Sequence, residues 1–103
     1  MGAELEKAKQ IAGQLGGWDR RIVEITATQD DKPELICRFE PEPEGDAQGY
    51  FWIANLLTRM EFELEIDSPF DLGFQIGDQV YLPNGRILNN REEHMRVWPN
   101  DED

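Results

Sequence analysis

The chain has 103 residues, a length that suits one domain with a modest hydrophobic core. Its 22 acidic and 10 basic side chains give a net charge of −12, which argues against binding to nucleic acid or to an anionic membrane and favours a basic protein partner. The only cysteine, Cys37, excludes an internal disulfide framework, and the sequence shows neither a signal peptide nor an apolar run of the about 20 residues that a membrane span needs. We therefore expect a cytoplasmic protein.

The first element is a predicted short helix over residues 3–15. Gly16 and Gly17 follow it and are expected to end it, because glycine readily adopts the left-handed conformation at a helix C-terminus. A helix of this length is marginal on its own, so we expect it to pack on the rest of the chain. The apolar residues that define its buried face are Leu5, Ala8, Ile11, Ala12 and Leu15.

Residues 18–28 and 35–40 both alternate between apolar and polar side chains, which is typical of half-buried strands. The turn residues 30–33 join them, so the pair is predicted to form an antiparallel hairpin. Arg38 lies on the polar face of the second strand and is a candidate neighbour for acidic side chains. The apolar faces comprise Val23, Ile25 and Ala27 on the first strand and Leu35, Cys37 and Phe39 on the second.

The next segment, residues 41–49, is PEPEGDAQG, and its prolines, glycines and acidic residues predict an acidic loop. Residues 50–57, YFWIANLL, are the most apolar run of the chain, and their length allows a strand or a short helix. We favour a strand over residues 50–54. If Phe51 is buried on that strand, Tyr50 and Trp52 emerge together on the other face, as an anchor for a partner or as a homodimer contact.

The most regular pattern is MEFELEID, residues 60–67, in which apolar and acidic residues alternate without a break. Strand periodicity places the acidic side chains on one face, where they meet solvent unless arginines on neighbouring strands cover them. Repulsion between neighbouring carboxylates costs about 0.6 kcal/mol per pair in water, whereas burial of four large apolar side chains contributes about 6 to 12 kcal/mol. We therefore expect a rigid strand that presents a row of carboxylates.

Short strands are predicted for the rest of the chain. Turns at Gly77–Asp78 and Pro83–Gly85 bound expected strands over residues 79–82 and 86–88, and Met95, Val97 and Trp98 mark a closing strand. Residues 99–103 are expected to be a disordered acidic tail.

These elements predict an α+β fold in one domain, residues 1–103. An N-terminal helix, residues 1–17, packs on a bent antiparallel sheet of five or six strands, residues 18–98. The turns also allow this sheet to curl into a small half-open barrel. The arginines that such a sheet offers as partners for the carboxylates are Arg20, Arg21, Arg38 and Arg86.

Residues that carry catalysis are scarce. His94 lies in a charged segment and is expected at the surface, Cys37 is expected in the core, and Ser68 lacks a nucleophile-elbow pattern. There is no phosphate-binding glycine loop, no zinc-ligand spacing and no EF-hand loop. We therefore expect no enzyme activity, no cofactor and no metal.

The leading hypothesis is a small acidic protein-binding domain, such as an inhibitor, an antitoxin or immunity protein, or a nucleic-acid-mimicking decoy, that acts on a basic partner. One alternative is an assembly subunit that forms a homodimer or larger oligomer through an aromatic surface, and another is a small ligand-binding or hydrolytic barrel with an acidic cleft. The candidate partner-binding residues are Glu42, Glu44, Asp46, Tyr50, Trp52, Glu61, Glu63, Glu65 and Asp67.

Overall fold

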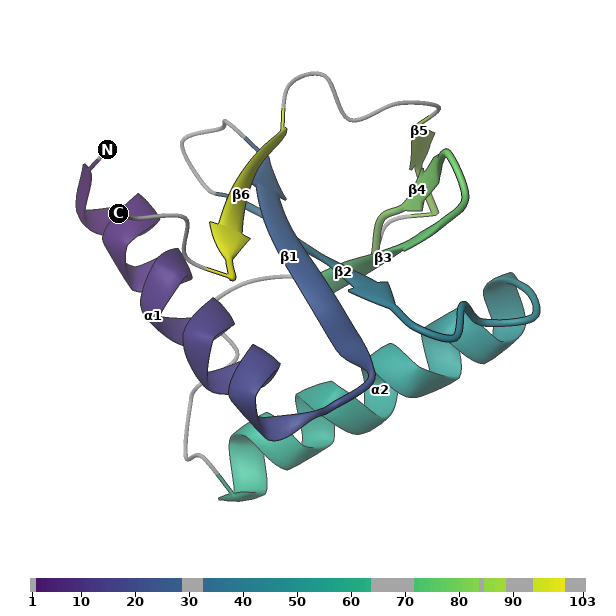
Figure 1. The fold of residues 1–103 in the computed structure, drawn as a ribbon, viewed down its shortest axis with the longest axis horizontal. Coiled ribbons are helices and arrows are strands. Elements are labelled where there is room, and N and C mark those ends of the chain that lie inside the picture. Colours follow the sequence, from purple (N-terminus) through teal and green to yellow (C-terminus); the bar gives the residue numbers. More distant parts are fainter. Residues whose placement is uncertain (1, 29–32, 64–71, 84, 89–93, 100–103) are drawn as a thin grey trace.

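The computed structural model describes residues 2–28, 33–63, 72–83, 85–88 and 94–99. The elements in chain order are α1 (Gly2–Trp18), β1 (Ile22–Thr28), β2 (Leu35–Phe39), α2 (Asp46–Glu63), β3 (Leu72–Ile76), β4 (Gln79–Tyr81), β5 (Ile87–Leu88) and β6 (His94–Trp98). Figure 1 shows the two helices beside one sheet, with α1 along one side and α2 running across its lower end. The predicted α+β class is confirmed.

The sheet has six strands in the order β5-β4-β3-β2-β1-β6 and is not closed into a barrel. Neighbouring strands are antiparallel except β2 and β3, which run parallel, with Cys37 paired to Phe74. The predicted antiparallel sheet of five or six strands over residues 18–98 is thus found with one exception, the parallel pair β2 and β3. The reason is α2, since a helix between two strands is the usual connection that lets them run parallel.

Both helices pack on one face of the sheet. Ile25, Cys37 and Phe74 belong to the same buried cluster as the inner faces of α1 and α2, whereas Ile36 belongs to a second cluster with Val80 and Leu82. Because successive side chains of a strand point to opposite faces, these two clusters lie on the two sides of the sheet. The buried helix residues in the first cluster are Ala8, Ile11, Ala12, Leu15, Ile53, Leu56 and Met60.

The first helix extends further than the sequence predicts. It continues through Gly16 and Gly17 and ends at Trp18, so the expected stop at these glycines was wrong. Gly16 faces the ring of Trp98 in β6, and a β-carbon at Gly16 would overlap that ring. The absence of a side chain there lets the helix lie close to the sheet, which explains a glycine within a helix despite its cost in propensity.

The predicted hairpin between the first two strands is confirmed, with Ala27 paired to Leu35 in antiparallel register. A bulge lies between Ile22 and Glu24, so Ile22 enters the core and Val23 is only half-buried. The later strands and the turn at Gly77, which has a φ of 60°, also agree with the prediction. The closing strand is β6, which pairs antiparallel with β1. The expected tail lies outside the described residues beyond Pro99.

The main correction concerns residues 46–63, which form one helix of 18 residues. The strand predicted over residues 50–54 was wrong, and so was the strand predicted to begin at Met60, whose described part, residues 60–63, is the last turn of α2. Residues 64–67 of that prediction lie outside the described residues. The buried face of α2 comprises Gly49, Ile53, Leu56 and Met60, whose spacing of three and four residues is helical.

The start of α2 is fixed by two local hydrogen bonds. The N–H of Gly49 donates to the carbonyl oxygen of Gly45 at 3.1 Å, which opens the helical ladder. The side chain of Gln48 accepts from the backbone N–H of Glu44 at 2.8 Å, and in this way it satisfies an amide just outside the helix, as the glutamine of a capping box does. Asp46 in the first turn is favourably placed in the field of the helix dipole.

Candidate functional site

The solvent-facing side of α2 carries two exposed phenylalanines. Phe51 is 64% exposed and Phe62 is 80% exposed. They lie eleven positions apart, which is close to three helical turns at about 3.6 residues per turn, so both project from the same side of the helix. Ala54, Asn55 and Thr58 are exposed between them. We call the surface formed by these five residues the outward face of α2.

The expected pairing of Tyr50 with Trp52 does not occur. On a helix, residues two positions apart point to different sides, and the structure separates these two rings accordingly. The Tyr50 ring lies edge-on to Phe74 with 5.0 Å between centroids, and its hydroxyl donates to the carbonyl oxygen of Leu82 at 3.4 Å.

Trp52 lies on the other flank of the helix and is partly buried. Its ring is edge-on to Phe39, with 5.2 Å between centroids, and the guanidinium of Arg21 lies 4.5 Å from its centroid. Asp19 holds Arg21 there, because its carboxylate accepts a hydrogen bond from Nη2 of Arg21 at 2.9 Å. The same hydrogen bond lowers the pKa of the Asp19 carboxyl. Trp52 therefore packs against the core with a cation over its ring. Phe51, whose burial was the condition for the paired exposure of Tyr50 and Trp52, is the residue that meets solvent.

Acidic residues gather at the N-terminal end of α2. The carboxylate of Glu42 accepts a hydrogen bond from the backbone N–H of Gly77 at 2.9 Å, which brings the acidic loop to the β3–β4 turn. The turn also carries Asp78, and Glu44 and Asp46 lead into the helix. Glu42, Glu44, Asp46 and Asp78 are all exposed. We call these four residues the acidic end.

The predicted row of carboxylates is not a row in the described part of the chain. Glu61 and Glu63 are exposed, but they lie in the last turn of α2 and point to different sides of it. Glu63 lies 3.8 Å from Arg59, one turn earlier, in an exposed ion pair. Glu65 and Asp67 lie outside the described residues. The two described acids thus form a second acidic region, at the opposite end of α2 from Asp46.

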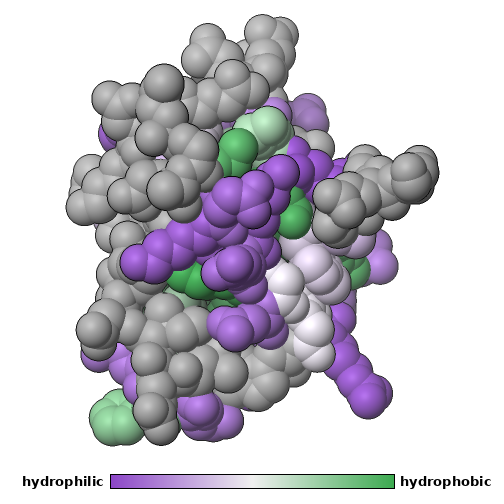
Figure 2. Space-filling view, turned by 90° about the vertical axis from the view of Figure 1, so that its left-hand side faces the viewer, coloured by the Kyte–Doolittle hydropathy of each residue, from purple (hydrophilic) through white to green (hydrophobic). Residues whose placement is uncertain are grey.

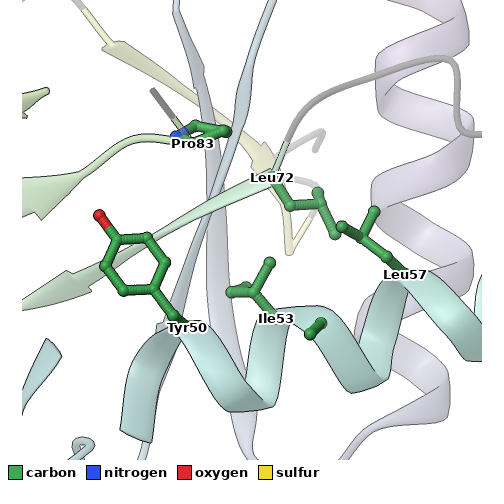
Figure 3. Close-up of a pocket in the computed structure, with 6 residues that line it drawn as sticks. Tyr50, Ile53, Leu57, Leu72 and Pro83 are labelled. Atoms are coloured by element: carbon green, nitrogen blue, oxygen red, sulfur yellow. The ribbon is translucent and has the colours of Figure 1, made fainter. Parts of the chain in front are cut away.

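A groove runs along α2 next to the outward face. Its volume is about 200 Å³, and it is half-open to solvent. Figure 3 shows Ile53 and Leu57 of α2 directed toward Leu72, with Tyr50 at one end and Pro83 opposite the helix. Ala54 also lines the groove, so this residue belongs both to the groove and to the outward face. We call the space lined by these six residues the α2 groove.

The other face of the sheet carries a charge network. Glu24 is 7% exposed and accepts hydrogen bonds from the Nε of Arg38 and from the Nε of Arg96, both at 3.1 Å. Arg38, the candidate neighbour for the acidic row, thus pairs with a carboxylate of the adjacent strand. One buried anion between two half-exposed arginines fixes the register of β2, β1 and β6 and is a structural device.

Cys37 is fully buried, as expected, and burial raises the pKa of its thiol to about 12. The described residues contain no group of three or more His, Cys, Asp or Glu side chains able to hold a metal ion.

Among the helices described, none is both long and apolar enough to cross a membrane. Figure 2 views the molecule from the side on which α1 lies in Figure 1, and hydrophilic side chains dominate the described part of that face.

The outward face and the α2 groove were both missed by the sequence analysis. The signal that identifies them is the helical spacing of Gly49, Ile53, Leu56 and Met60, preceded by Asp46 and Gln48 as residues typical of a helix N-terminus. Once residues 46–63 are recognised as a helix, the eleven-residue spacing of Phe51 and Phe62 places both rings on the same side of it.

A scan against protein-family models found no match, and comparisons with curated proteins and with solved structures found none either.

Proposed function

We propose that this chain is a non-enzymatic protein-binding domain that recognises a basic partner through the outward face of α2. The observation that carries the proposal is the exposure of Phe51 and Phe62 on one side of a single helix. Two large rings in solvent are costly for a small soluble protein, and aromatic residues are enriched among the anchors of protein interfaces.

The charge of the chain supports a basic partner. The acidic end precedes Phe51, and Glu61 and Glu63 flank Phe62, so each ring has carboxylates close by along the helix. In a chain with a net charge of −12, such carboxylates attract a cationic surface over about one Debye length, near 8 Å at physiological salt. The carboxylates supply long-range attraction, which chiefly raises the association rate and the specificity. The rings of Phe51 and Phe62 supply the apolar contact that is buried in the complex.

The alternative is self-association through the same rings. It differs from the first proposal in its response to salt, because two copies of a chain with charge −12 repel each other and salt screens that repulsion. Salt therefore strengthens a homodimer and weakens a complex with a basic partner. Light scattering at two protein concentrations, in 50 mM and 500 mM salt, separates the two cases.

The test of the main proposal compares three immobilised proteins: the native chain, the double variant Phe51→Ser with Phe62→Ser, and the control Ile87→Ser. Ile87 is 50% exposed on β5, so the control removes an exposed apolar side chain away from α2. We expect the native chain and the control to retain the same basic proteins, with release by 0.5 M salt, and the double variant to lose them. Circular dichroism verifies that all three are folded.

Retention of the same proteins by the double variant would contradict a role for the outward face. Retention of acidic or neutral proteins that 0.5 M salt leaves bound would contradict the basic partner.

A further inference from the structure

The α2 groove lies alongside the surface that the proposed partner covers. Ala54 is exposed and lines the groove, and it is followed one turn later by Thr58 on the outward face. A partner seated on Phe51 therefore lies within one side chain's reach of the groove. Within α2, Ala54 places only a methyl group at the border between the outward face and the groove.

The size of the groove restricts what it can hold. Ligand pockets for small molecules usually have about 300–1,000 Å³, whereas a closed apolar cavity of about 150 Å³ holds a benzene-sized group. With about 200 Å³ and a lining of apolar side chains, the α2 groove matches one large apolar side chain. Among the described residues that line the groove, the Tyr50 hydroxyl is the only polar side-chain group, and it already donates to the carbonyl oxygen of Leu82.

The elements that contribute residues to the groove are followed or preceded in the chain by charged residues of both signs. Asp46 lies one turn before the groove residue Tyr50 on the same stripe of α2. Glu42 accepts from the N–H of Gly77, next to Asp78 in the β3–β4 turn. This turn follows β3, the strand that contributes Leu72 to the groove and carries Phe74 against Tyr50. On the loop side, Arg86 is exposed and its carbonyl oxygen accepts from the N–H of Leu82 at 2.9 Å.

We propose that the α2 groove binds one leucine- or phenylalanine-sized side chain of a basic peptide segment, whose cationic neighbours lie over the acidic end. This inference rests on the proposed function and names the chemistry of the partner: an apolar anchor with arginine or lysine beside it. Asp46 selects for the cations, and the groove selects for the apolar residue.

The experiment uses two acetylated and amidated hexapeptides as probes. One has two leucines flanked on each side by two arginines, and the other has serine in place of both leucines. Titration into the ¹⁵N-labelled protein at 20 mM salt reports which backbone amides shift. We expect the leucine peptide to shift the amides of Tyr50, Ala54, Leu57 and Leu72 and to bind about ten-fold or more tightly than the serine peptide, because only leucine buries apolar surface.

Two matched variants locate the binding on the groove. Ala54→Leu fills the groove mouth, and Ala47→Leu makes the same change at an exposed alanine of the same helix that does not line the groove. Both positions are exposed on a helix, where leucine is well tolerated. We expect Ala54→Leu to weaken the leucine peptide at least about five-fold and Ala47→Leu to leave its affinity unchanged.

The charge variants complete the test. Asp46→Asn is expected to weaken both peptides about two- to five-fold, and Arg86→Gln to strengthen both by a similar factor, as for exposed ion pairs.

Equal affinity of the leucine and serine peptides, or shifts confined to Phe51 and Phe62, overturns the groove as the anchor site and leaves the proposed function standing. Absence of binding by either peptide at 20 mM salt overturns the preference for basic partners, and the groove inference falls with it. Shifts at the groove that appear without peptide, on raising the protein concentration alone, show that a second copy of the chain occupies it and also overturn the inference.

Discussion

A β-carbon on Gly49 would overlap the ring of Phe74, so the backbone of α2 rests directly on an aromatic side chain of β3. The same ring stacks on Tyr81 at 5.0 Å between centroids with an interplanar angle of 5° and receives the edge of Tyr50. Phe74 thus packs directly under the N-terminal half of α2. The contact between this ring and Gly49 determines the distance between the helix and the sheet, and with it the position of the outward face and of the α2 groove.

Gly49→Ala is therefore expected to destabilise the fold, although alanine is the better helix former by about 1 kcal/mol. Overpacking of this kind costs about 1–3 kcal/mol, and the rigid ring of Phe74 has no flexible end that could move aside. Urea unfolding measures the difference. The matched control is Gly13→Ala, because a β-carbon at Gly13 in α1 meets nothing within 4 Å, and this variant should gain up to about 1 kcal/mol. A Gly49→Ala protein as stable as the native chain would contradict the close contact between the backbone of Gly49 and the ring of Phe74.

Replacement of Glu24 tests the network on the other sheet face. Glu24→Gln keeps the shape of the side chain but leaves the two arginine Nε groups without an anion, so we expect a loss of about 1–3 kcal/mol. Glu63→Gln breaks an exposed ion pair with Arg59 and should cost less than about 0.5 kcal/mol. Equal effects of the two substitutions in chemical denaturation would show that burial of Glu24 is unimportant.

The Asp19–Arg21 pair should make stability depend on pH. Hydrogen bonds from Arg21 hold the pKa of the Asp19 carboxyl below its usual value. A lowered folded-state pKa contributes stability that is present above the unfolded pKa of about 3.9 and is lost as pH falls through the folded pKa.

Asp19→Asn is therefore expected to cost about 1–3 kcal/mol at pH 7, and its difference from the native chain should shrink below pH about 4. Asp78→Asn, at an exposed turn position, is the control. Thermal unfolding between pH 2 and pH 7 follows both variants, and a difference that stays constant over this range would refute the linkage.

The thiol of Cys37 is expected to be inert in the folded protein. With a pKa of about 12 and no exposed surface, it should react with a thiol reagent at pH 8 about a thousand-fold more slowly than the unfolded chain. The measurement is the rate of modification with and without urea. A native rate within ten-fold of the unfolded rate would mean that β2 opens readily.

The sequence predicts the strands of this fold well because a sheet with one buried face imposes a period of two on residues such as Ile25, Ala27, Leu35 and Cys37. It failed for α2, where two patterns compete. The acidic alternation that begins at Met60 has the period of a strand, and the spacing from Gly49 to Met60 has the period of a helix.

The reason that helix formation prevails at residues 46–63 lies in tertiary contacts that a local pattern does not contain. Gly49 looks like a helix breaker until Phe74, 25 positions later, occupies the space above it. This difference decides the candidate site. On a strand Phe51 would be buried between Tyr50 and Trp52, whereas on the helix it is exposed and the other two rings support the core.

The pairing of β6 with β1 has a consequence for biosynthesis. About 70 residues separate the two strands, so at a translation rate of about 5–20 residues per second β1 leaves the ribosome several seconds before the strand that will flank it. During that interval the β1 edge of the nascent hairpin exposes unpaired backbone N–H and C=O groups, which can pair with strands of other chains. The negative charge of the chain opposes such pairing by repulsion between chains. The sheet is therefore complete only after β6, which is synthesised later than the other five described strands, has paired with β1.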